Sequence, residues 1–275
     1  MRLFLLGYPL GHSLSPAMQN AALAEVGLAD WHYDLRPVRT DDLGFVLADV
    51  RRPDVAGANV TVPHKQAVIP YLDGLTPTAL AMGAVNTLVK EGGRLIGHNT
   101  DAAGLLADLA LHGARLTGAR VLVLGAGGSA RAAVAGCLGV GAQVRVIARR
   151  PEQAEDLRTL GSIEVFPWTP IGFIEASDDV AVVLNTTPLG MHPNVDVSPW
   201  LEGTPWPVAS LVYDLVYNPA ETLFVRQARE HDLNATTGLG MLVEQGALAF
   251  ELWTGKPAPR AVMRAAAETK RAGAV

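Results

Sequence analysis

The apolar positions of this chain fall into short continuous runs separated by alanine-rich segments of helical character. In the second half of the chain the runs are rich in leucine and β-branched residues, and we expect each to form a buried strand. Strands that alternate with helices predict a parallel, doubly wound sheet. The strands of this sheet are predicted at 120–124, 143–148, 163–166, 180–184 and 211–215.

The region before this sheet has strands and helices of its own. Ser15 is expected to be the N-cap of an alanine-rich helix, with Pro16 at its first position. Glu91-Gly92-Gly93 separates two strand patterns and indicates a hairpin. The region is too long for an extension and long enough for a domain. Its strands are predicted at 2–7, 31–38, 56–60, 86–90 and 95–99, and its helices at 15–27, 41–51, 64–71 and 101–112. Two further helices are predicted near the end of the chain, at 239–254 and 260–271.

A glycine cluster follows the strand at 120–124 and leads into an alanine-rich helix. Gly125 permits a tight turn, Gly127 lets phosphates approach the backbone, and Ala130 stands where a third small residue lets helix and strand pack closely. This arrangement directs backbone N–H groups and a helix N-terminus at a pyrophosphate. We therefore predict a dinucleotide site, for which the alternative is a purely structural glycine turn.

The end of the next strand distinguishes between the two nicotinamide cofactors. An NAD site usually carries Asp or Glu there, bound to the ribose hydroxyls, whereas an NADP site carries Arg near the 2′-phosphate. No acidic residue ends the strand at 143–148, and Arg149 and Arg150 follow it directly. Because guanidinium groups match phosphate geometry bidentately, we predict NADP. The alternative is a solvated basic turn before the helix that starts near Pro151.

Composition restricts the class of protein further. Apolar residues make up 49% of the 275 residues and charged residues 18%, which predicts a folded chain with an ample core. The net charge of −5 argues against a surface for nucleic acid or anionic membrane. One cysteine excludes a disulfide framework, and the histidines show no metal-ligand spacing, so we predict no metal. The apolar run at 3–6 is too short for a signal peptide or a membrane span, and we expect a cytoplasmic protein.

Polar clusters of the first region lie just after predicted strands or in turns, where ligand groups of α/β folds gather. Their hydroxyls, amides, single lysine and single carboxylate suit a small polyhydroxylated acid. Because a domain precedes the glycine loop, we expect catalysis in the cleft between a substrate domain and a nucleotide domain. The clusters are Ser13-Leu14-Ser15, Asn59-Val60-Thr61-Val62-Pro63-His64-Lys65, Asn86 and Asn99-Thr100-Asp101.

These clusters and the glycine loop belong to eight motifs that, in this order, make the chain resemble the shikimate dehydrogenase family along nearly its whole length. One departure stands after the second strand of the nucleotide unit, where the family usually has Asn-Arg-Thr and this chain has Ala148-Arg149-Arg150. The motifs in the first region are Gly11-His12-Ser13-Leu14-Ser15-Pro16, residues 59–65, Gly83-Ala84-Val85-Asn86-Thr87 and Gly97-His98-Asn99-Thr100-Asp101. Those that follow are residues 125–131, Asn185-Thr186-Thr187-Pro188-Leu189-Gly190-Met191, residues 213–219 and residues 238–247.

The resemblance implies a role for each candidate residue. It implies that Lys65 and Asp101 carry proton transfer and that Ser13 and Ser15 bind the substrate carboxylate. Ring hydroxyls would be held by Thr61, Asn86, Asp101 and Gln245, with Tyr217 near the substrate. The pyrophosphate would be bound by Gly125, Ala126, Gly127, Gly128, Ser129 and Ala130, and the 2′-phosphate by Arg149, which matches the family. Arg150 departs from the family pattern and is a candidate for the 2′-phosphate through its position after the strand. Thr186, Gly238 and Met241 would lie near the nicotinamide.

Each implied role has a structural alternative. Ser15 and Asp101 suit helix N-caps, which is compatible with a ligand role because a cap lies beside free N–H groups. Lys65 has the alternative of a solvated helix residue, but lysine occupies only four of the 22 basic positions, which favours a need for a group that can lose its proton. Gln245 has the alternative of a satisfied buried amide, and Met241 that of core filler.

We therefore predict an α/β protein with an N-terminal α/β substrate domain and a Rossmann-type doubly wound NADP-binding domain. The expected reaction is the reversible NADPH-dependent reduction of 3-dehydroshikimate to shikimate, in the biosynthesis of aromatic amino acids. The alternatives are a quinate/shikimate dehydrogenase with relaxed substrate and cofactor choice, and a non-catalytic NADP-binding sensor. A homodimer is an assembly that the sequence permits. The segments are 1–101 for the substrate-binding catalytic domain, 102–237 for the NADP-binding domain and 238–275 for C-terminal helices that return to the substrate domain.

Overall fold

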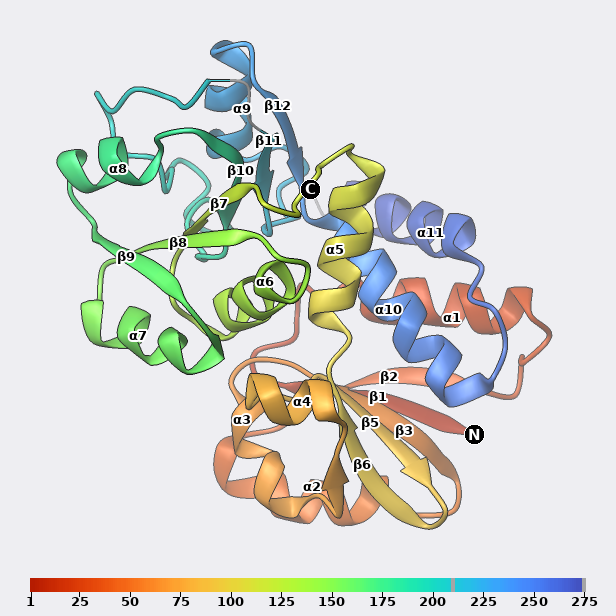
Figure 1. Ribbon diagram of the computed structural model, residues 1–275. Coiled ribbons are helices and arrows are strands. Elements are labelled where there is room, and N and C mark those ends of the chain that lie inside the picture. The colour runs from red at the N-terminus through yellow and green to blue at the C-terminus, as the bar shows by residue number, and fades with distance from the viewer. Residues whose placement is uncertain (209–210, 274–275) are drawn as a thin grey trace. The chain divides into compact units, whose positions relative to one another are not determined.

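The computed structural model describes residues 1–208 and 211–273, which form two compact units (Figure 1). Unit 1 comprises Met1–Gly104 and the described residues from Val243 onward, and unit 2 comprises Leu105–Leu242. The chain thus leaves unit 1 inside helix α5 (Asp101–Leu111) and leaves unit 2 inside helix α10 (Leu239–Thr254). The expected boundaries at 101 and 237 lie where these helices begin, because capping and glycine signals mark the start of a helix and not where it changes neighbours.

Unit 1 contains a six-stranded mixed sheet in the order β2-β1-β3-β5-β6-β4. The first three strands in this order are parallel to one another, whereas β5 is antiparallel to both β3 and β6. The predicted hairpin is therefore present as β5 and β6. The strands are β1 (Arg2–Gly7), β2 (His32–Pro37), β3 (Val55–Val60), β4 (Gly74–Leu75), β5 (Thr87–Glu91) and β6 (Arg94–His98).

Both faces of the unit 1 sheet are covered by helices. Along β1, Phe4 and Leu6 pack in a cluster with Leu47 of α2, whereas the alternate residues Leu3 and Leu5 are also buried and point to the other face. Figure 1 shows α2 and α4 on one side of this sheet and α1 and α10 on the other. The helices of unit 1 before α5 are α1 (Ser15–Glu25), α2 (Leu43–Val50), α3 (His64–Ala67) and α4 (Pro77–Met82).

Unit 2 contains an all-parallel sheet in the order β12-β11-β10-β7-β8-β9, which confirms the predicted Rossmann-type fold. The strand order reverses between β7 and β10, and in such sheets ligands bind at this point, beyond the carboxyl ends of the strands. The strands are β7 (Arg120–Leu124), β8 (Gln143–Ala148), β9 (Ile163–Pro167), β10 (Val180–Asn185), β11 (Leu211–Asp214) and β12 (Asn234–Thr237).

The central strand β7 shows why this sheet is buried on both sides. Val121 and Val123 pack in a cluster with residues of α6 and α7, while Leu122 and Leu124 pack in another with residues of α8 and α9. A strand that contacts helices on both faces is continuously apolar, which is the pattern the sequence presents. The helices that lie wholly in unit 2 are α6 (Gly128–Gly139), α7 (Pro151–Asp156), α8 (Pro170–Ala176) and α9 (Leu223–Glu230). Helix α11 (Arg260–Ala272), at the end of the chain, belongs to unit 1. Short 3₁₀ turns lie at Thr40–Asp42, Ile69–Tyr71 and Leu157–Leu160.

None of the helices within residues 1–208 and 211–273 combines the length and the apolar character that crossing a bilayer requires.

Candidate active site

The predicted catalytic pair is formed in unit 1. Lys65 lies on α3, just beyond the end of β3, and Asp101 is the first residue of α5. The Lys65 Nζ donates a hydrogen bond to the Asp101 Oδ2 at 2.7 Å, and the two side chains are only 19% and 9% exposed. An ammonium group in a partly sheltered place, held by one carboxylate, is equipped to donate a proton to a neighbouring oxygen and to recover it.

Asn86 holds the second oxygen of this carboxylate. Its Nδ2 donates to Asp101 Oδ1 at 2.8 Å and to the Thr100 hydroxyl at 2.9 Å. Its Oδ1 accepts from the Thr100 backbone N–H at 2.8 Å, which fixes the orientation of the amide. Gln245 on α10 also approaches, with its Oε1 3.4 Å from Asn86 Nδ2. Both oxygens of Asp101 are therefore held, one by an amide and one by Lys65, so that the carboxylate has one defined position.

The two serines are arranged differently from the sequence prediction. Helix α1 begins at Ser15 itself, the N-cap position belongs to Leu14, and no side chain caps the helix. The Ser15 backbone N–H instead donates to Ser13 Oγ at 3.2 Å, so that the earlier serine satisfies the first donor of the helix. The prediction of Ser15 as N-cap was wrong because Leu14 has helical backbone angles and occupies the N-cap position, so that Ser15 is already the first residue of the helix. Ser13 accepts this bond, and its own O–H remains available to donate to an anion.

A second layer of hydrogen bonds orders the polar groups of unit 1 from behind. Tyr33 on β2 is fully buried and donates to Asn59 Oδ1 at 2.7 Å. Asn59 Nδ2 donates in turn to the Asn86 carbonyl and to the Thr87 hydroxyl, each at 3.1 Å. Thr87 donates to Asn86 Oδ1 at 3.0 Å. The amide of Asn86, which holds Asp101, is thus itself held in place.

The structure therefore brings some of the predicted substrate-side residues together in one hydrogen-bonded group. Thr61 follows β3, and its N–H donates to the Leu6 carbonyl at 2.8 Å, which fixes its backbone at the end of the strand. The members of the hydrogen-bonded group are Lys65, Asn86, Asp101 and Gln245.

Sequence reasoning missed Tyr33 and Thr87 as supports of this group. Tyr33 lies on a strand, where an aromatic residue predicts core packing and gives no sign of its hydroxyl partner. Asn59, in contrast, belongs to the polar cluster at residues 59–65 that was identified from the sequence. Tyr217, which the resemblance places near the substrate, lies in unit 2 after β11, where burial raises the pKa of its hydroxyl.

The predicted phosphate loop lies in unit 2 between β7 and α6. Gly125 has φ +107°, and a side chain there would meet the Thr186 hydroxyl at 2.8 Å, so both conformation and space require glycine. Gly127 and Gly128 are exposed, and a Cβ on either would meet no atom within 4 Å, which leaves room for a ligand against the backbone. Ala130 is fully buried in the cluster that contains Val121. The residues therefore fit a pyrophosphate at the start of α6.

The neighbouring strand end is tied to this loop. The Thr186 N–H and hydroxyl both donate to the Leu124 carbonyl, at 2.9 and 2.7 Å, directly before Gly125. Gly238 packs so closely that a Cβ would lie 2.5 Å from the Leu215 carbonyl. Met241 lies in the first turn of α10 and is half-buried. The predicted nicotinamide-side residues thus lie at the carboxyl edge of the sheet, after β10 and after β12.

Arg149 and Arg150 are both exposed at the end of β8. Arg150 is the N-cap residue of α7, with extended backbone and no side-chain cap, and Pro151 is the first helical residue as expected. Among the described residues no carboxylate forms an ion pair with either guanidinium, so both are available to a phosphate.

Asp214, the last residue of β11, is fully buried at the carboxyl edge of the unit 2 sheet. It was not among the predicted site residues. Its Oδ1 accepts from Asn185 Nδ2 at 2.8 Å and from the Val216 N–H at 3.0 Å, and its Oδ2 accepts from the Thr222 hydroxyl at 2.6 Å. Burial nevertheless raises the pKa of Asp214 to about 6, because the loss of solvation outweighs these three hydrogen bonds.

This raised pKa predicts a pH-dependent stability. Asp214 binds its proton more tightly in the folded than in the unfolded chain. Its contribution to the free energy of unfolding is therefore fully present below about pH 4 and is lost as the pH rises through about 6. The total loss is ~3 kcal/mol. Asp214→Asn cannot ionise; its Oδ1 can still accept from Asn185 and from the Val216 N–H, and its Nδ2 can donate to the Thr222 hydroxyl. We expect its melting temperature to rise relative to wild type between pH 5 and pH 7.5, measured by thermal unfolding. Asp196→Asn, at a position near the surface, is the control. If the difference in melting temperature between Asp214→Asn and wild type is the same at pH 5 and at pH 7.5, the pKa of Asp214 is not raised.

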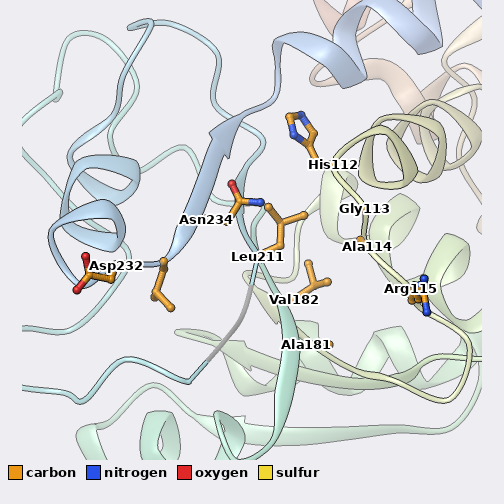
Figure 2. Close-up of a pocket in the computed structure, with 10 residues that line it drawn as sticks. His112, Gly113, Ala114, Arg115, Ala181, Val182, Leu211, Asp232 and Asn234 are labelled. Carbon is orange, nitrogen blue, oxygen red and sulfur yellow. The ribbon is translucent and has the colours of Figure 1, made fainter.

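A cavity of about 520 Å³ opens elsewhere in unit 2, at the amino ends of β10, β11 and β12 (Figure 2). His112, Arg115, Asp232 and Asn234 line it together with apolar residues. It contains none of the predicted site residues and lies at the edge of the sheet opposite the phosphate loop. No group of three or more histidine, cysteine or acidic residues suited to a metal occurs in the part of the chain that the structure describes.

A glycine loop that fits a phosphate at the switch point of a Rossmann sheet, in one chain with a lysine–carboxylate pair among hydroxyls and amides, is the arrangement of a nicotinamide-dependent oxidoreductase. The comparisons with known proteins specify which one. Residues 5–88 match the family described as shikimate dehydrogenase substrate binding domain, and residues 238–268 match the shikimate 5'-dehydrogenase C-terminal domain.

The sequences of relatives align with nearly the whole length of this chain. The shikimate dehydrogenase (NADP(+)) of Symbiobacterium thermophilum is 43% identical over 274 residues, covering 96% of this chain and 92% of the relative. That of Moorella thermoacetica is 44% identical over 272 residues, covering 94% and 90%. The crystal structure of shikimate 5-dehydrogenase from Thermus thermophilus in complex with NADP(H) and shikimate matches with a TM-score of 0.90 and 38% identity, covering 98% of this chain and 99% of that one. The chain belongs to the shikimate dehydrogenase family.

Proposed function

We propose that the protein catalyses the reversible NADPH-dependent reduction of 3-dehydroshikimate to shikimate, as part of the biosynthesis of aromatic compounds. The observation that carries the proposal is the 2.7 Å contact between Lys65 Nζ and Asp101 Oδ2, sheltered in unit 1 among amides and hydroxyls. Membership of the family, with relatives named as NADP(+)-dependent shikimate dehydrogenases, supports both the substrate and the cofactor.

In the proposed reaction Lys65 is the proton donor. NADPH, when bound, supplies the hydride that reduces the ring carbonyl. As the carbonyl oxygen gains negative charge, the Lys65 ammonium stabilises it and donates a proton, which leaves a neutral amine and a hydroxyl. Asp101, whose second oxygen is held by Asn86 at 2.8 Å, keeps the Lys65 Nζ in place and accepts a hydrogen bond from a substrate hydroxyl. In the oxidative direction the Lys65 amine takes the same proton back.

The remaining polar groups of unit 1 are proposed to hold the substrate. Ser13 donates to the carboxylate, since its Oγ already accepts the Ser15 N–H at 3.2 Å and its proton is directed elsewhere. Ser15 is the second carboxylate ligand. The ring hydroxyls are held by Thr61, Asn86, Asp101 and Gln245. Tyr217, which belongs to unit 2, is proposed to lie near the substrate.

On the cofactor side we propose that residues 125–130 bind the pyrophosphate through backbone N–H groups at the start of α6. Thr186, Gly238 and Met241 face the nicotinamide. Arg149 and Arg150 bind the 2′-phosphate, which supports NADP even though the family's asparagine is replaced here by Ala148. Gly127 offers its backbone to the ligand, because nothing occupies the space beside its Cα.

Replacement of Arg149 tests the choice of cofactor. Arg149→Ala removes a charge-assisted contact worth about 1.5–3 kcal/mol, so KM for NADP⁺ should rise roughly tenfold or more. KM for NAD⁺, which has no 2′-phosphate, should stay nearly constant. Because the arginine is exposed, the ratio between variant and wild type should shrink at high salt. Arg150→Ala measured in parallel tells how the two arginines share the phosphate. Equal losses for both cofactors would mean that Arg149 supports the loop rather than the phosphate.

The proposed activity is tested by one set of assays at the nicotinamide absorbance. Shikimate and quinate are each offered with NADP⁺ and with NAD⁺. We expect the highest kcat/KM for shikimate with NADP⁺. Comparable rates with quinate would favour a quinate/shikimate dehydrogenase, and tight NADP⁺ binding without turnover of either acid would favour a sensor. A cytoplasmic location and a homodimer remain predictions from the sequence, to be checked by fractionation and by light scattering.

A further inference from the structure

A buried tyrosine and a buried aspartate in unit 2 support the first turn of α10. Tyr213 on β11 is fully buried, and Asp108 on α5 is 1% exposed. The Tyr213 hydroxyl donates to Asp108 Oδ2 at 2.6 Å and accepts from the Met241 backbone N–H at 3.2 Å. The carboxylate can only accept and the N–H can only donate, so the hydroxyl has one orientation.

Gly240 shows how tightly this group is fitted. A Cβ at Gly240 would lie 1.9 Å from Asp108 Oδ1 and 2.2 Å from its Cγ, so the carboxylate occupies the space that any side chain would need. His112, one helical turn beyond Asp108, packs edge-on against the Tyr213 ring with 6.3 Å between the ring centroids. Asp108 is therefore fixed by packing on one side and by the tyrosine hydroxyl on another.

The Tyr213 hydroxyl also fixes the backbone at Met241. The Met241 N–H is one of the first four of α10, which have no partner within the helix, and the Tyr213 hydroxyl is that partner. The carboxylate of Asp108 also lies against the start of the helix, where negative charge is favoured. Gly238, in the preceding turn, is packed against the Leu215 carbonyl of the segment that follows β11. The backbone from Gly238 to Met241 is thus held at both ends.

We propose that Tyr213 and Asp108 are positioning residues that set the placement of Met241 against the nicotinamide. This inference rests on the proposed function, which places Gly238 and Met241 at that end of the cofactor. Neither side chain needs to touch the cofactor, since both are buried and act through the backbone of α10. Loss of the tyrosine hydroxyl should therefore affect the nicotinamide half of the cofactor and leave the adenosine half unaffected.

Tyr213→Phe is the direct test, because it removes the hydroxyl and keeps the ring that packs against His112. The binding of NADP⁺ is compared with that of adenosine 2′,5′-bisphosphate, which has the 2′-phosphate but no nicotinamide. We expect the Kd for NADP⁺ to rise about five- to thirtyfold and that of the bisphosphate to change less than about twofold. The kcat for shikimate oxidation should fall about tenfold or more, because a misplaced nicotinamide loses its orientation.

Thr222→Val is a matched control. The Thr222 hydroxyl also donates to a buried carboxylate, Asp214 Oδ2 at 2.6 Å, and accepts a backbone N–H, that of Val225 at 3.3 Å, at the start of α9. Its removal should lower the melting temperature as Tyr213→Phe does and leave the ratio of the two affinities unchanged. Asp108→Asn, which keeps an acceptor for Tyr213, should rescue most of the NADP⁺ affinity that Asp108→Leu loses.

Three outcomes would overturn the proposal. Equal losses of NADP⁺ and of the bisphosphate in Tyr213→Phe would indicate general damage to unit 2. Unchanged NADP⁺ binding and kcat would show that the hydroxyl is not needed for positioning. If Thr222→Val weakens NADP⁺ relative to the bisphosphate as much as Tyr213→Phe does, the effect is not specific to Tyr213 and Asp108. If wild-type protein binds NADP⁺ and does not oxidise shikimate, the proposed function fails, and the comparison of the two ligands still tests Tyr213 and Asp108.

Discussion

Replacement of Lys65 by methionine is expected to lower kcat for shikimate oxidation by roughly 10²–10⁴-fold, the usual contribution of a general acid–base group. Methionine keeps most of the length and volume of the side chain and has no proton to exchange. The KM for shikimate should change far less, because Ser13, Ser15, Thr61 and the Asn86–Asp101 pair are retained. The measurement is steady-state kinetics in both directions, with NADP⁺ and shikimate varied separately.

Lys90 offers a matched control for this variant. Its Nζ donates to the Arg52 carbonyl at 2.7 Å in an exposed part of the same unit. Lys90→Met makes the same chemical change and should leave kcat within about twofold of wild type, as surface substitutions usually have small effects. A Lys65→Met enzyme with nearly normal kcat would remove Lys65 from the chemistry and leave its contact with Asp101 as a structural ion pair.

Ser13→Ala is expected to raise KM for shikimate by roughly 10- to 150-fold, since a hydrogen bond to a charged group is worth about 1.5–3 kcal/mol. The effect on kcat should be smaller, because the carboxylate lies away from the reacting carbonyl. The KM for NADP⁺ should not change, since Ser13 and the phosphate loop belong to different units of the fold.

Ser13 also accepts the Ser15 N–H at 3.2 Å, so its removal changes the backbone as well as the pocket. Ser198 isolates that second effect, because its Oγ accepts the Trp200 N–H at the same distance, 3.2 Å, in unit 2. Ser198→Ala therefore loses an equivalent local bond and should retain the wild-type KM for shikimate. If Ser13→Ala loses NADP⁺ affinity and keeps that for shikimate, the division of labour between the two units is wrong.

The features that the sequence predicted best are those that local chemistry determines. Gly125 and Ala130 indicate a strand, a tight turn and a closely packed helix, and each occupies the place its chemistry requires. The apolar runs of β7 and β10 predict buried parallel strands because such strands contact helices on both faces. Strand β12 was missed, since Asn234-Ala235-Thr236-Thr237 is polar, short and at the edge of the sheet, where no apolar run is needed.

The residues that escaped prediction are supports whose partners lie far along the chain. Tyr213 meets an aspartate 105 residues earlier, and Tyr33 meets Asn59 across 26 residues. Nothing in the surrounding sequence distinguishes these hydroxyls from those of ordinary core tyrosines, because the hydrogen-bond partner is set by the tertiary fold. Ser15 failed as an N-cap because Leu14 already has helical backbone angles and takes that position, a one-residue shift in the start of the helix that composition alone does not reveal.

The shelter around Lys65 has a practical consequence for chemical modification. Amine-directed reagents and immobilisation resins attack the lysines that solvent reaches, and Lys256 and Lys270 are both exposed. Lys65 has a side chain only 19% exposed, and its Nζ is engaged by Asp101. Limited acylation or attachment through amines should therefore modify Lys256 and Lys270 before Lys65, the proposed proton donor. The protein is therefore suited to tethering through lysine with the Lys65 amine intact.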